Sequence, residues 1–235
     1  MILIFASQYD PSSVTLAARW ADHNANIITC ADLSVAGWRH NLQSHAASTA
    51  VVGGRVIPVQ EINGVLIRWP GVFAQELAQI TPADREYVAK EMMAFLVSWF
   101  LSLNCPVINQ PTPVSLIGPA WRLEQWTYAA AQIGIPVQKA RRHVVLGGDD
   151  VEPSLPSTTT NLTVVGDRCF GDVEQKLREQ SVRLAKAAGV SLMSISFSGP
   201  EANSFFVGAD LMPKLSVETE DAVLELLVTQ EAAAA

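Results

Sequence analysis

The segment 81-TPADREYVAKEMMAFLVSWFLSLNCPVINQP-111 decides the fold of this protein. Its start predicts a helix, because Thr81 can cap it with a hydroxyl, Pro82 suits the first helical position, and Asp84 suits the positive end of the dipole. Apolar residues continue to Leu103, and in the second half of the predicted helix they occupy nearly every side. A helix without a polar face should lie deep in the molecule.

A short buried strand is expected directly after this helix. Asn104 and Pro106 end the helical pattern, and residues 106–109 read Pro-Val-Ile-Asn. Residues 64–69, Gly-Val-Leu-Ile-Arg-Trp, form another apolar run of strand length before the helix. Strand, helix and strand together predict a βαβ unit and a parallel sheet, with residues 107–109 as a central strand.

The other elements are expected from turn residues and hydrophobic patterns on both sides of this unit. Strands are expected at residues 1–7, 27–30, 134–137, 162–165, 169–170, 191–197 and 204–207, with a hairpin at 51–59. Helices are expected after a cap at Ser12 or Ser13, over 120–133, from Asp172 to Gly189, and over 219–228. Residues 147–161, rich in Gly, Asp, Pro, Ser and Thr, are expected to form an exposed linker.

Composition and charge exclude several classes of function. The chain has 235 residues and a net charge of −7, so neither nucleic acid nor an anionic membrane is an expected partner. The longest apolar run, residues 92–103, is shorter than the roughly 20 residues of a membrane span, and the start of the chain reads as a strand and not a signal peptide. Cys30, Cys105 and Cys169 are expected to be reduced core thiols, which indicates a cytoplasmic protein.

The end of each predicted parallel strand is a possible ligand site. The turn after the first strand, residues 8–11, contains no glycine, so backbone N–H groups cannot approach a pyrophosphate and dinucleotide binding is not expected. Arg68 is more informative, because it ends a strand and ligands of open α/β sheets lie beyond the carboxyl ends of the strands. A pair with a surface acid is the alternative interpretation of Arg68.

Four stretches of the chain carry, in order, the motifs of one known family. They are residues 4–10, 66–70 (Leu-Ile-Arg-Trp-Pro), 107–111 (Val-Ile-Asn-Gln-Pro) with 134–137 (Gly-Ile-Pro-Val), and 164–168 (Val-Val-Gly-Asp-Arg) with 205–213. Their order and content resemble the ATP-grasp superfamily, and within it the ligases that modify ribosomally made peptides, such as the microviridin-type enzymes. The resemblance touches most of the chain.

The resemblance implies an α/β fold of two parts. A Rossmann-like, pre-ATP-grasp-like domain with a mostly parallel sheet would occupy residues 1–117. A reduced ATP-grasp-like α+β domain, with an antiparallel sheet and without the lid of active enzymes, would occupy residues 118–235. That lid brings a lysine and a glycine-rich flap onto the ATP phosphates, and only about two dozen residues separate Val137 from Leu162 here.

Other positions of the family's nucleotide site also differ in this chain. Asn161 holds the position of an arginine that reaches the phosphates. The magnesium-binding motif Phe-Leu-Glu-Val-Asn becomes Phe-Val-Gly-Ala-Asp at residues 206–210, so Gly208 replaces the glutamate and only Asp210 offers a carboxylate. Ser194 or Ser196 stands where an aspartate is expected. Because nucleotide-bound magnesium needs carboxylate oxygens, ATP and magnesium are expected to be lost as cofactors.

These differences predict a catalytically degenerate ATP-grasp-like protein, a binding or accessory subunit of a biosynthetic or peptide-modification complex. No catalytic residue is assigned, because no Ser/His/Asp order, Cys–His pair or carboxylate cluster stands out. The alternative is an active ATP-dependent carboxylate–amine ligase or transferase with a trimmed nucleotide site. A third interpretation is a stand-alone α/β binding protein whose likeness to the family is accidental.

Arg68, Asn109 and Asp210 are the expected ligand-binding residues. Arg68 would hold a small anionic ligand by a forked pair of hydrogen bonds, and Asn109 would supply a donor and an acceptor. The competing interpretation is a structural ion pair between Arg68 and Asp210. No metal site is expected, because His40 and His45 have no carboxylate or cysteine nearby. The many tryptophans and the face exposed by a missing lid predict a homodimer or a protein partner.

Overall fold

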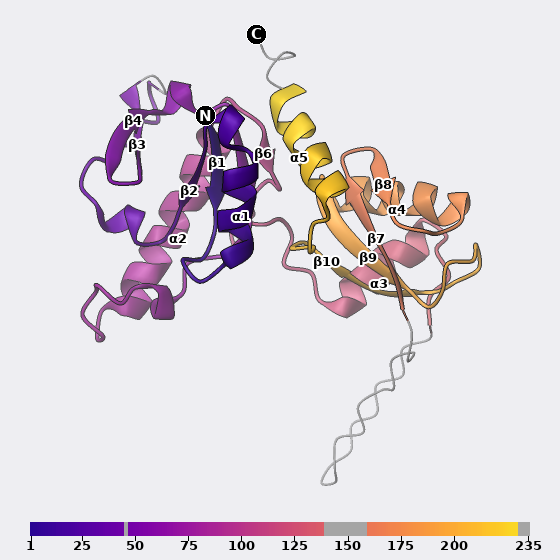
Figure 1. Ribbon diagram of the computed structural model, residues 1–235. Coiled ribbons are helices and arrows are strands. Elements are labelled where there is room, and N and C mark those ends of the chain that lie inside the picture. The colour runs from indigo at the N-terminus through magenta and orange to yellow at the C-terminus, as the bar shows by residue number, and fades with distance from the viewer. Residues whose placement is uncertain (45–46, 139–158, 230–235) are drawn as a thin grey trace, which may run out of the picture. The chain divides into compact units, whose positions relative to one another are not determined.

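The computed structural model describes residues 1–44, 47–138 and 159–229, and the chain divides into two units (Figure 1). The first unit combines Met1–Ala120 with Lys214–Ala235, and the second is Trp121–Pro213. The domains expected from the sequence are 1–117 and 118–235, so the two divisions differ mainly in the segment from Lys214 onward. Most of the predicted linker, and the region where the lid is expected to be missing, lie outside the described residues.

The first unit is built on a parallel sheet. Its strands β1 (Ile2–Phe5), β2 (Ala25–Ile28), β5 (Gly64–Ile67) and β6 (Val107–Ile108) lie in the order β2-β1-β5-β6. All neighbouring pairs are parallel, which confirms the βαβ unit. Among the described strands β6 pairs only with β5, so the expectation of a central strand at residues 107–109 is wrong. It is an edge strand because each later strand in the described part of the chain joins the other sheet.

The helix of the deciding segment, α2 (Arg85–Ser102), begins later than predicted. Residues 82–84 form a turn, in which the Asp84 N–H donates to the Thr81 carbonyl at 2.9 Å. Asp84 therefore takes the N-cap position, without a side-chain hydrogen bond, and Thr81 is not the cap.

α2 is buried on one side only. Leu96, Trp99 and Phe100 are buried in the core that it shares with the sheet, whereas Ala94 and Leu101 are exposed. The expectation of a helix that is covered on every side is therefore wrong, because α2 covers the sheet from outside, and its outer side carries charged residues such as Lys90 and Glu91 beside the apolar Ala94 and Leu101.

The opposite face of the parallel sheet is covered by α1 (Pro11–Arg19) and α5 (Val217–Thr229). Strand side chains alternate between the two faces, so Leu3 and Phe5 join the α2 core while Ile2 points the other way. A Cβ added to Gly64 would lie 3.1 Å from Leu227 of α5 and 3.2 Å from Ile2, which shows how closely α5 packs on β5 and β1. The two layers of helices enclose the sheet.

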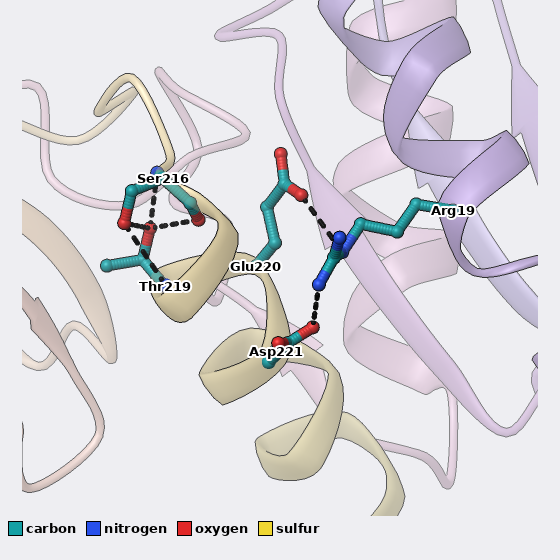
Figure 2. A network of polar contacts seen from close by, with 5 residues as sticks. All are labelled: Arg19, Ser216, Thr219, Glu220 and Asp221. Carbon is teal, nitrogen blue, oxygen red and sulfur yellow. Dashed lines mark hydrogen bonds and ion pairs between the residues drawn. The ribbon is translucent and has the colours of Figure 1, made fainter.

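Polar contacts hold the start of α5 and tie it to α1 (Figure 2). The Ser216 N–H donates to Thr219 Oγ1 at 2.7 Å, and the Thr219 N–H donates back to Ser216 Oγ at 3.4 Å, an arrangement like a capping box. Arg19 of α1 pairs with Glu220 at 3.3 Å and with Asp221 at 2.7 Å.

Smaller elements complete the first unit. The predicted hairpin is confirmed as β3 (Thr49–Val52) and β4 (Arg55–Pro58), which pair antiparallel. Gly53 and Gly54 have φ of 55° and 75°, values that a two-residue hairpin turn needs and that glycine adopts readily. The described 3-10 helices are η1 (Ala21–His23), η2 (Asp32–Ser34), η4 (Val59–Glu61) and η5 (Ala74–Glu76).

The second unit contains an antiparallel sheet in the order β10-β9-β7-β8. Its strands are β7 (Thr160–Val165), β8 (Arg168–Phe170), β9 (Leu192–Phe197) and β10 (Phe206–Asp210), as the late strand–turn–strand pattern predicted. Val137 adds an isolated parallel bridge to Phe206 where a strand was expected. The predicted helices are α3 (Leu123–Gln132) and α4 (Gln175–Ala188).

One face of this sheet is apolar, and the other carries mostly polar side chains. Leu162, Val164, Met193 and Ile195 are buried, and α3 and α4 pack on the sheet. α4 begins after an N-cap at Glu174 rather than Asp172 and ends, as predicted, at Gly189 with φ of 66°. Within the described part of the chain, no helix has the length and apolar character that a membrane crossing needs.

Candidate functional site

The carboxyl ends of β1 and β5 form the most informative edge of the parallel sheet. β1 leads through α1 to β2 on one side, whereas β5 leads through α2 to β6 on the other, so the strand order reverses between β1 and β5. Ligands of open α/β sheets bind at such a switch point, beyond the carboxyl ends of the strands. Ser7 and Asp10 follow β1 at this edge, and Arg68 follows β5.

Asp10 and Arg68 pair at the switch point. The Arg68 backbone N–H donates to the Phe5 carbonyl at 2.8 Å, which holds the end of β5 against β1. Arg68 Nε lies 3.5 Å from Asp10 Oδ2, and the two side chains are 13% and 19% exposed. Arg68 thus pairs with an acid of its own unit, as the alternative interpretation held, although the sequence did not identify Asp10 as that acid.

Asp10 also caps α1, the role expected for Ser12 or Ser13. The Ser12 N–H and hydroxyl donate to Oδ1 at 3.0 and 2.5 Å, and the Ser13 hydroxyl donates to Oδ2 at 2.6 Å. Pro11 therefore takes the first helical position. Burial raises the pKa of Asp10, but hydrogen bonds from Ser12 and Ser13 and the charge of Arg68 outweigh burial and hold the pKa below its usual value.

Ser7 and Glu76 form a second polar pair beside β1. The Ser7 hydroxyl donates to Glu76 Oε1 at 2.6 Å. Glu76 is only 5% exposed, and its Oε2 has no hydrogen-bond partner among the described residues. Burial and then the charge of Glu76 raise the pKa of the Cys30 thiol to about 12, so Cys30 is a protonated core thiol, as predicted.

Asn109 follows β6, at the same edge of the sheet as Arg68, and its side chain lies inside the first unit. It is 2% exposed, and its Nδ2 donates to the Ile117 carbonyl at 3.2 Å. The Thr112 hydroxyl donates to the Gly118 carbonyl in the same loop at 3.1 Å. Asn109 therefore helps to hold the loop after β6.

Asp210 ends β10 on the polar face of the second unit's sheet. Across the strands, Asp210 pairs with Ser194, and Ser194 pairs with Thr163. The Asp210 side chain is engaged locally, since Oδ1 accepts the Met212 N–H at 2.9 Å.

A second row of the same face lies beside Asp210. It runs from Gly208 through Ser196 to Asn161. The Ser196 hydroxyl donates to Asn161 Oδ1 at 2.6 Å, so the amide at the position expected for a phosphate-binding arginine is part of a neutral hydrogen-bonded pair.

The donors of these two rows do not fit a magnesium–nucleotide complex. Asp210 is the one acidic side chain among the six paired positions, and the others offer hydroxyls, an amide or no side chain. Magnesium requires near-octahedral oxygen ligands, with carboxylates among them in nucleotide sites. Throughout residues 1–44, 47–138 and 159–229, no three His, Cys, Asp or Glu side chains gather in a group that could hold a metal ion.

Sequence reasoning located Arg68 but missed its immediate surroundings. Asp10 carries a usable signal, because Asp-Pro in the turn after a strand is typical of a helix N-cap followed by proline at the first position. Ser7 and Glu76 carry no such signal, because their contact joins residues that lie far apart in the chain.

No family model matches the sequence, and no curated protein matches it. Solved structures do match. The macrocyclase MdnC from Microcystis aeruginosa MRC, bound with precursor peptide MdnA, is 13% identical with a TM-score of 0.67, over 98% of this chain and 100% of that chain. A RiPP-associated ATP-grasp ligase from Chryseobacterium gregarium, in complex with ADP and a leader and core peptide, is 12% identical with a TM-score of 0.66, over 97% and 96%.

A RimK domain ATP-grasp protein from Sphaerobacter thermophilus DSM 20745 is 13% identical with a TM-score of 0.55, over 99% of both chains. These identities are low, so the likeness concerns the fold. It confirms that the fold of this chain resembles the fold of ATP-grasp proteins, as the sequence motifs indicated.

Proposed function

We propose that this protein is a catalytically degenerate ATP-grasp-like protein that binds a peptide or protein partner as an accessory subunit of a peptide-modification complex. Its fold supports a role related to that of the peptide-modifying ligases, two of which were solved with precursor, leader or core peptides. The alternative, an active ligase or transferase with a trimmed nucleotide site, is an outcome of the tests below.

The polar face of the second unit's sheet carries the proposal. The strand register pairs Asp210 with Ser194 and Gly208 with Ser196, so the two rows that should hold magnesium carboxylates contain one carboxylate between them. A single carboxylate leaves a nucleotide-bound metal without most of its protein ligands. The neutral pair of Ser196 and Asn161 supports the same interpretation, because it offers no positive charge to a phosphate.

The short segment between Val137 and Leu162 supports the loss of the lid. Without a lid, water would reach a bound nucleotide, and the lysine that neutralises its phosphates would be missing. We therefore propose that neither ATP nor magnesium is a cofactor of this protein, and that Arg68, Asn109 and Asp210 serve ligand or partner binding.

Isothermal titration calorimetry with ATP, with and without magnesium, tests the loss of the nucleotide site. We expect no magnesium-dependent binding at millimolar ATP, and no hydrolysis in a parallel phosphate-release assay. Weak binding of adenosine without metal is compatible with the proposal. A micromolar dissociation constant that requires magnesium would refute it and favour the trimmed ligase.

Peptide binding needs a separate test. Peptides selected on the immobilised full-length protein from an mRNA-displayed library can be labelled and measured by fluorescence anisotropy. We expect saturable binding that is unchanged by ATP, with scrambled peptides of the same composition as the matched control. Equal binding of scrambled and selected peptides would remove the peptide-binding half of the proposal.

A further inference from the structure

Arg68 lacks hydrogen-bond acceptors for its guanidinium. A guanidinium has five N–H donors in a planar fork, and this side chain is only 13% exposed. Its Nε is buried without a hydrogen-bond partner, and no hydrogen bond from the guanidinium to another described residue is found; the 3.5 Å contact with Asp10 is its one ion pair there. Nε is the one nitrogen of this guanidinium that is both buried and without a hydrogen bond; the two Nη nitrogens also have no acceptor among the described residues, but they are not buried and can meet a ligand.

Asp10 cannot supply the missing acceptor by itself. Its Oδ1 already accepts two hydrogen bonds from Ser12, and its Oδ2 accepts one from Ser13. A structural arginine–carboxylate pair usually forms two short parallel hydrogen bonds, whereas this pair has a 3.5 Å contact between Arg68 Nε and Asp10 Oδ2 and no hydrogen bond. The cap of α1 thus fixes the direction of the Asp10 carboxylate, which contacts Arg68 at Nε.

We infer that Arg68 is an oxyanion receptor at the switch point of the parallel sheet, held by Asp10 at its Nε edge and open to ligand at its Nη1–Nη2 edge. Asp10 is then a positioning residue, and Arg68 contacts the ligand. The inference deepens the proposed ligand-binding role and rests on it for the use of the site.

The shape of the fork determines the class of ligand. The Nη1 and Nη2 donors point in the same direction, so they match two oxygens on one atom, as in a carboxylate or a phosphate, and match a halide poorly. The location agrees, because β1 and β5 end here and the strand order reverses between them. A carboxylate and a phosphate share this chemistry, and the titrations below separate them.

Side-chain NMR of the full-length protein, labelled with ¹⁵N-arginine, tests the receptor directly. Sodium acetate and sodium phosphate are the probes, and sodium chloride at the same ionic strength is the control. We expect saturable shifts of the Arg68 Nη signals with acetate or phosphate, and the stronger of the two identifies the oxyanion. Shifts equal to those in chloride would overturn the inference.

The variant Arg68→Lys separates a receptor from a structural charge. Lysine keeps a positive charge beside Asp10 but has no fork. We therefore expect the dissociation constant of the oxyanion to rise at least about tenfold over wild type, because one bidentate contact is lost. If Arg68→Lys binds the probe as well as wild type does, simple charge attraction explains the binding and the fork is not used.

The variant Asp10→Asn tests the positioning role, because asparagine still caps α1 but carries no charge. We expect the Arg68 Nε–H to exchange faster with water than in wild type, and the preference for the oxyanion over chloride to fall by at least about threefold. Unchanged exchange and preference would remove Asp10 from the inference. Probe binding without any peptide binding would leave the receptor standing while the proposed function fails.

Discussion

Two demands meet at the single carboxylate of Asp10. It caps α1 through Ser12 and Ser13, and it faces the guanidinium of Arg68 at 3.5 Å. Its position is therefore fixed by a helix end, and the ion pair takes the geometry that remains. This explains why the pair is longer and less well aligned than two free side chains would make it.

Substitutions of Asp10 should separate these two demands. Asp10→Ala removes the cap and the partner of Arg68, so we expect a loss of at least about 1 kcal/mol in the free energy of unfolding. Asp10→Asn keeps a good cap and should lose less. Urea unfolding followed by tryptophan fluorescence measures both variants, and equal losses would contradict the capping role.

The contribution of Asp10 should also depend on pH. Because the pKa of Asp10 is lowered in the folded protein, its stabilisation is fully present above the unfolded value of about 3.9 and is lost as the pH falls through the lower folded value. We expect the wild type to lose stability more steeply than Asp10→Asn below about pH 4. Urea midpoints from pH 7 down to pH 2.5 test this, and parallel curves would argue against it.

Gly208 should accept a side chain although it lies within a strand. A Cβ added there meets no heavy atom within 4 Å, and its φ is not positive. We expect Gly208→Glu to change the free energy of unfolding by no more than about 0.5 kcal/mol. Gly171→Ala is the matched control, because its φ is +139° and the added Cβ would lie 2.9 Å from the Asn161 carbonyl oxygen.

Gly171→Ala should cost about 1–3 kcal/mol, the usual penalty for backbone strain of this kind. Chemical denaturation of both glycine variants provides the comparison. If Gly208→Glu proves as destabilising as the control, glycine is required there for the fold, and its presence says nothing about a lost magnesium ligand.

For single residues, the sequence indicates which side chains can bind a ligand better than it indicates which side chains they contact. Arg68 could be found because it ends an apolar run, and strand ends are where ligands bind. Its pairing with Asp10 could not be read from the chain, since the two lie on different strands' ends and the distance between them depends on the register of β1 and β5.

Among the elements, α5 depends on both apolar packing and surface charges. Leu227 is fully buried against Gly64 and Ile2, whereas Arg19 meets Glu220 and Asp221 at the surface. Core burial generally contributes far more than exposed ion pairs, which water and salt screen.

We therefore expect Leu227→Ala to cost about 2–5 kcal/mol in the free energy of unfolding. Arg19→Met should cost clearly less, and its effect should shrink further in 1 M NaCl. Urea unfolding of both variants measures the difference, and for Arg19→Met it is repeated in 1 M NaCl. A larger loss in Arg19→Met would mean that the ion pairs hold α5 in place.

Element types were predictable where short-range patterns decide them. The βαβ unit, the Gly53-Gly54 hairpin and the end of α4 at Gly189 follow from turn residues and apolar runs. The start of α2 could not be predicted, because Thr81, Pro82 and Asp84 fit a helix start and a turn equally well. The edge position of β6 depends on where later strands go, which no local pattern records.

Across the whole molecule, several tryptophans pack against one another, so fewer are available for an interface than the tryptophan content suggested. Trp38 and Trp99 contact each other with ring centroids 5.2 Å apart, and Trp121 and Trp126 do so at 4.7 Å. The expectation of a homodimer or stable complex now rests on exposed apolar side chains of the first unit: Phe73, Tyr87, Leu101 and Val114. Exposed apolar side chains of this kind are available for contact with another chain.

We expect this protein to be a homodimer or to be held in a stable complex. Light scattering coupled to gel filtration at several concentrations gives the mass of the purified protein. Leu101→Glu should weaken a dimer that uses α2, and Ala187→Glu on α4 of the second unit serves as the control of equal charge. A monomer at every concentration, with no partner co-purified from cells, would contradict the expectation.

The division of the chain into two units was the feature that the sequence predicted least well. The first unit was expected to end near residue 117, but it also includes the segment from Lys214. An amphipathic helix pattern at residues 219–228 predicts α5 itself, yet not the sheet that it covers. That choice depends on the bare face of β1 and β5, where Gly64 leaves room for Leu227.

The late arrival of α5 has a consequence for biosynthesis. A ribosome makes β1 to β6 first, then all of the second unit, and only afterwards the helix that covers Ile2 and Gly64. During translation the nascent first unit therefore waits with one side of its sheet open, while the contiguous second unit can fold as soon as it leaves the exit tunnel. Chaperones that capture apolar segments on the ribosome would meet this protein at that stage.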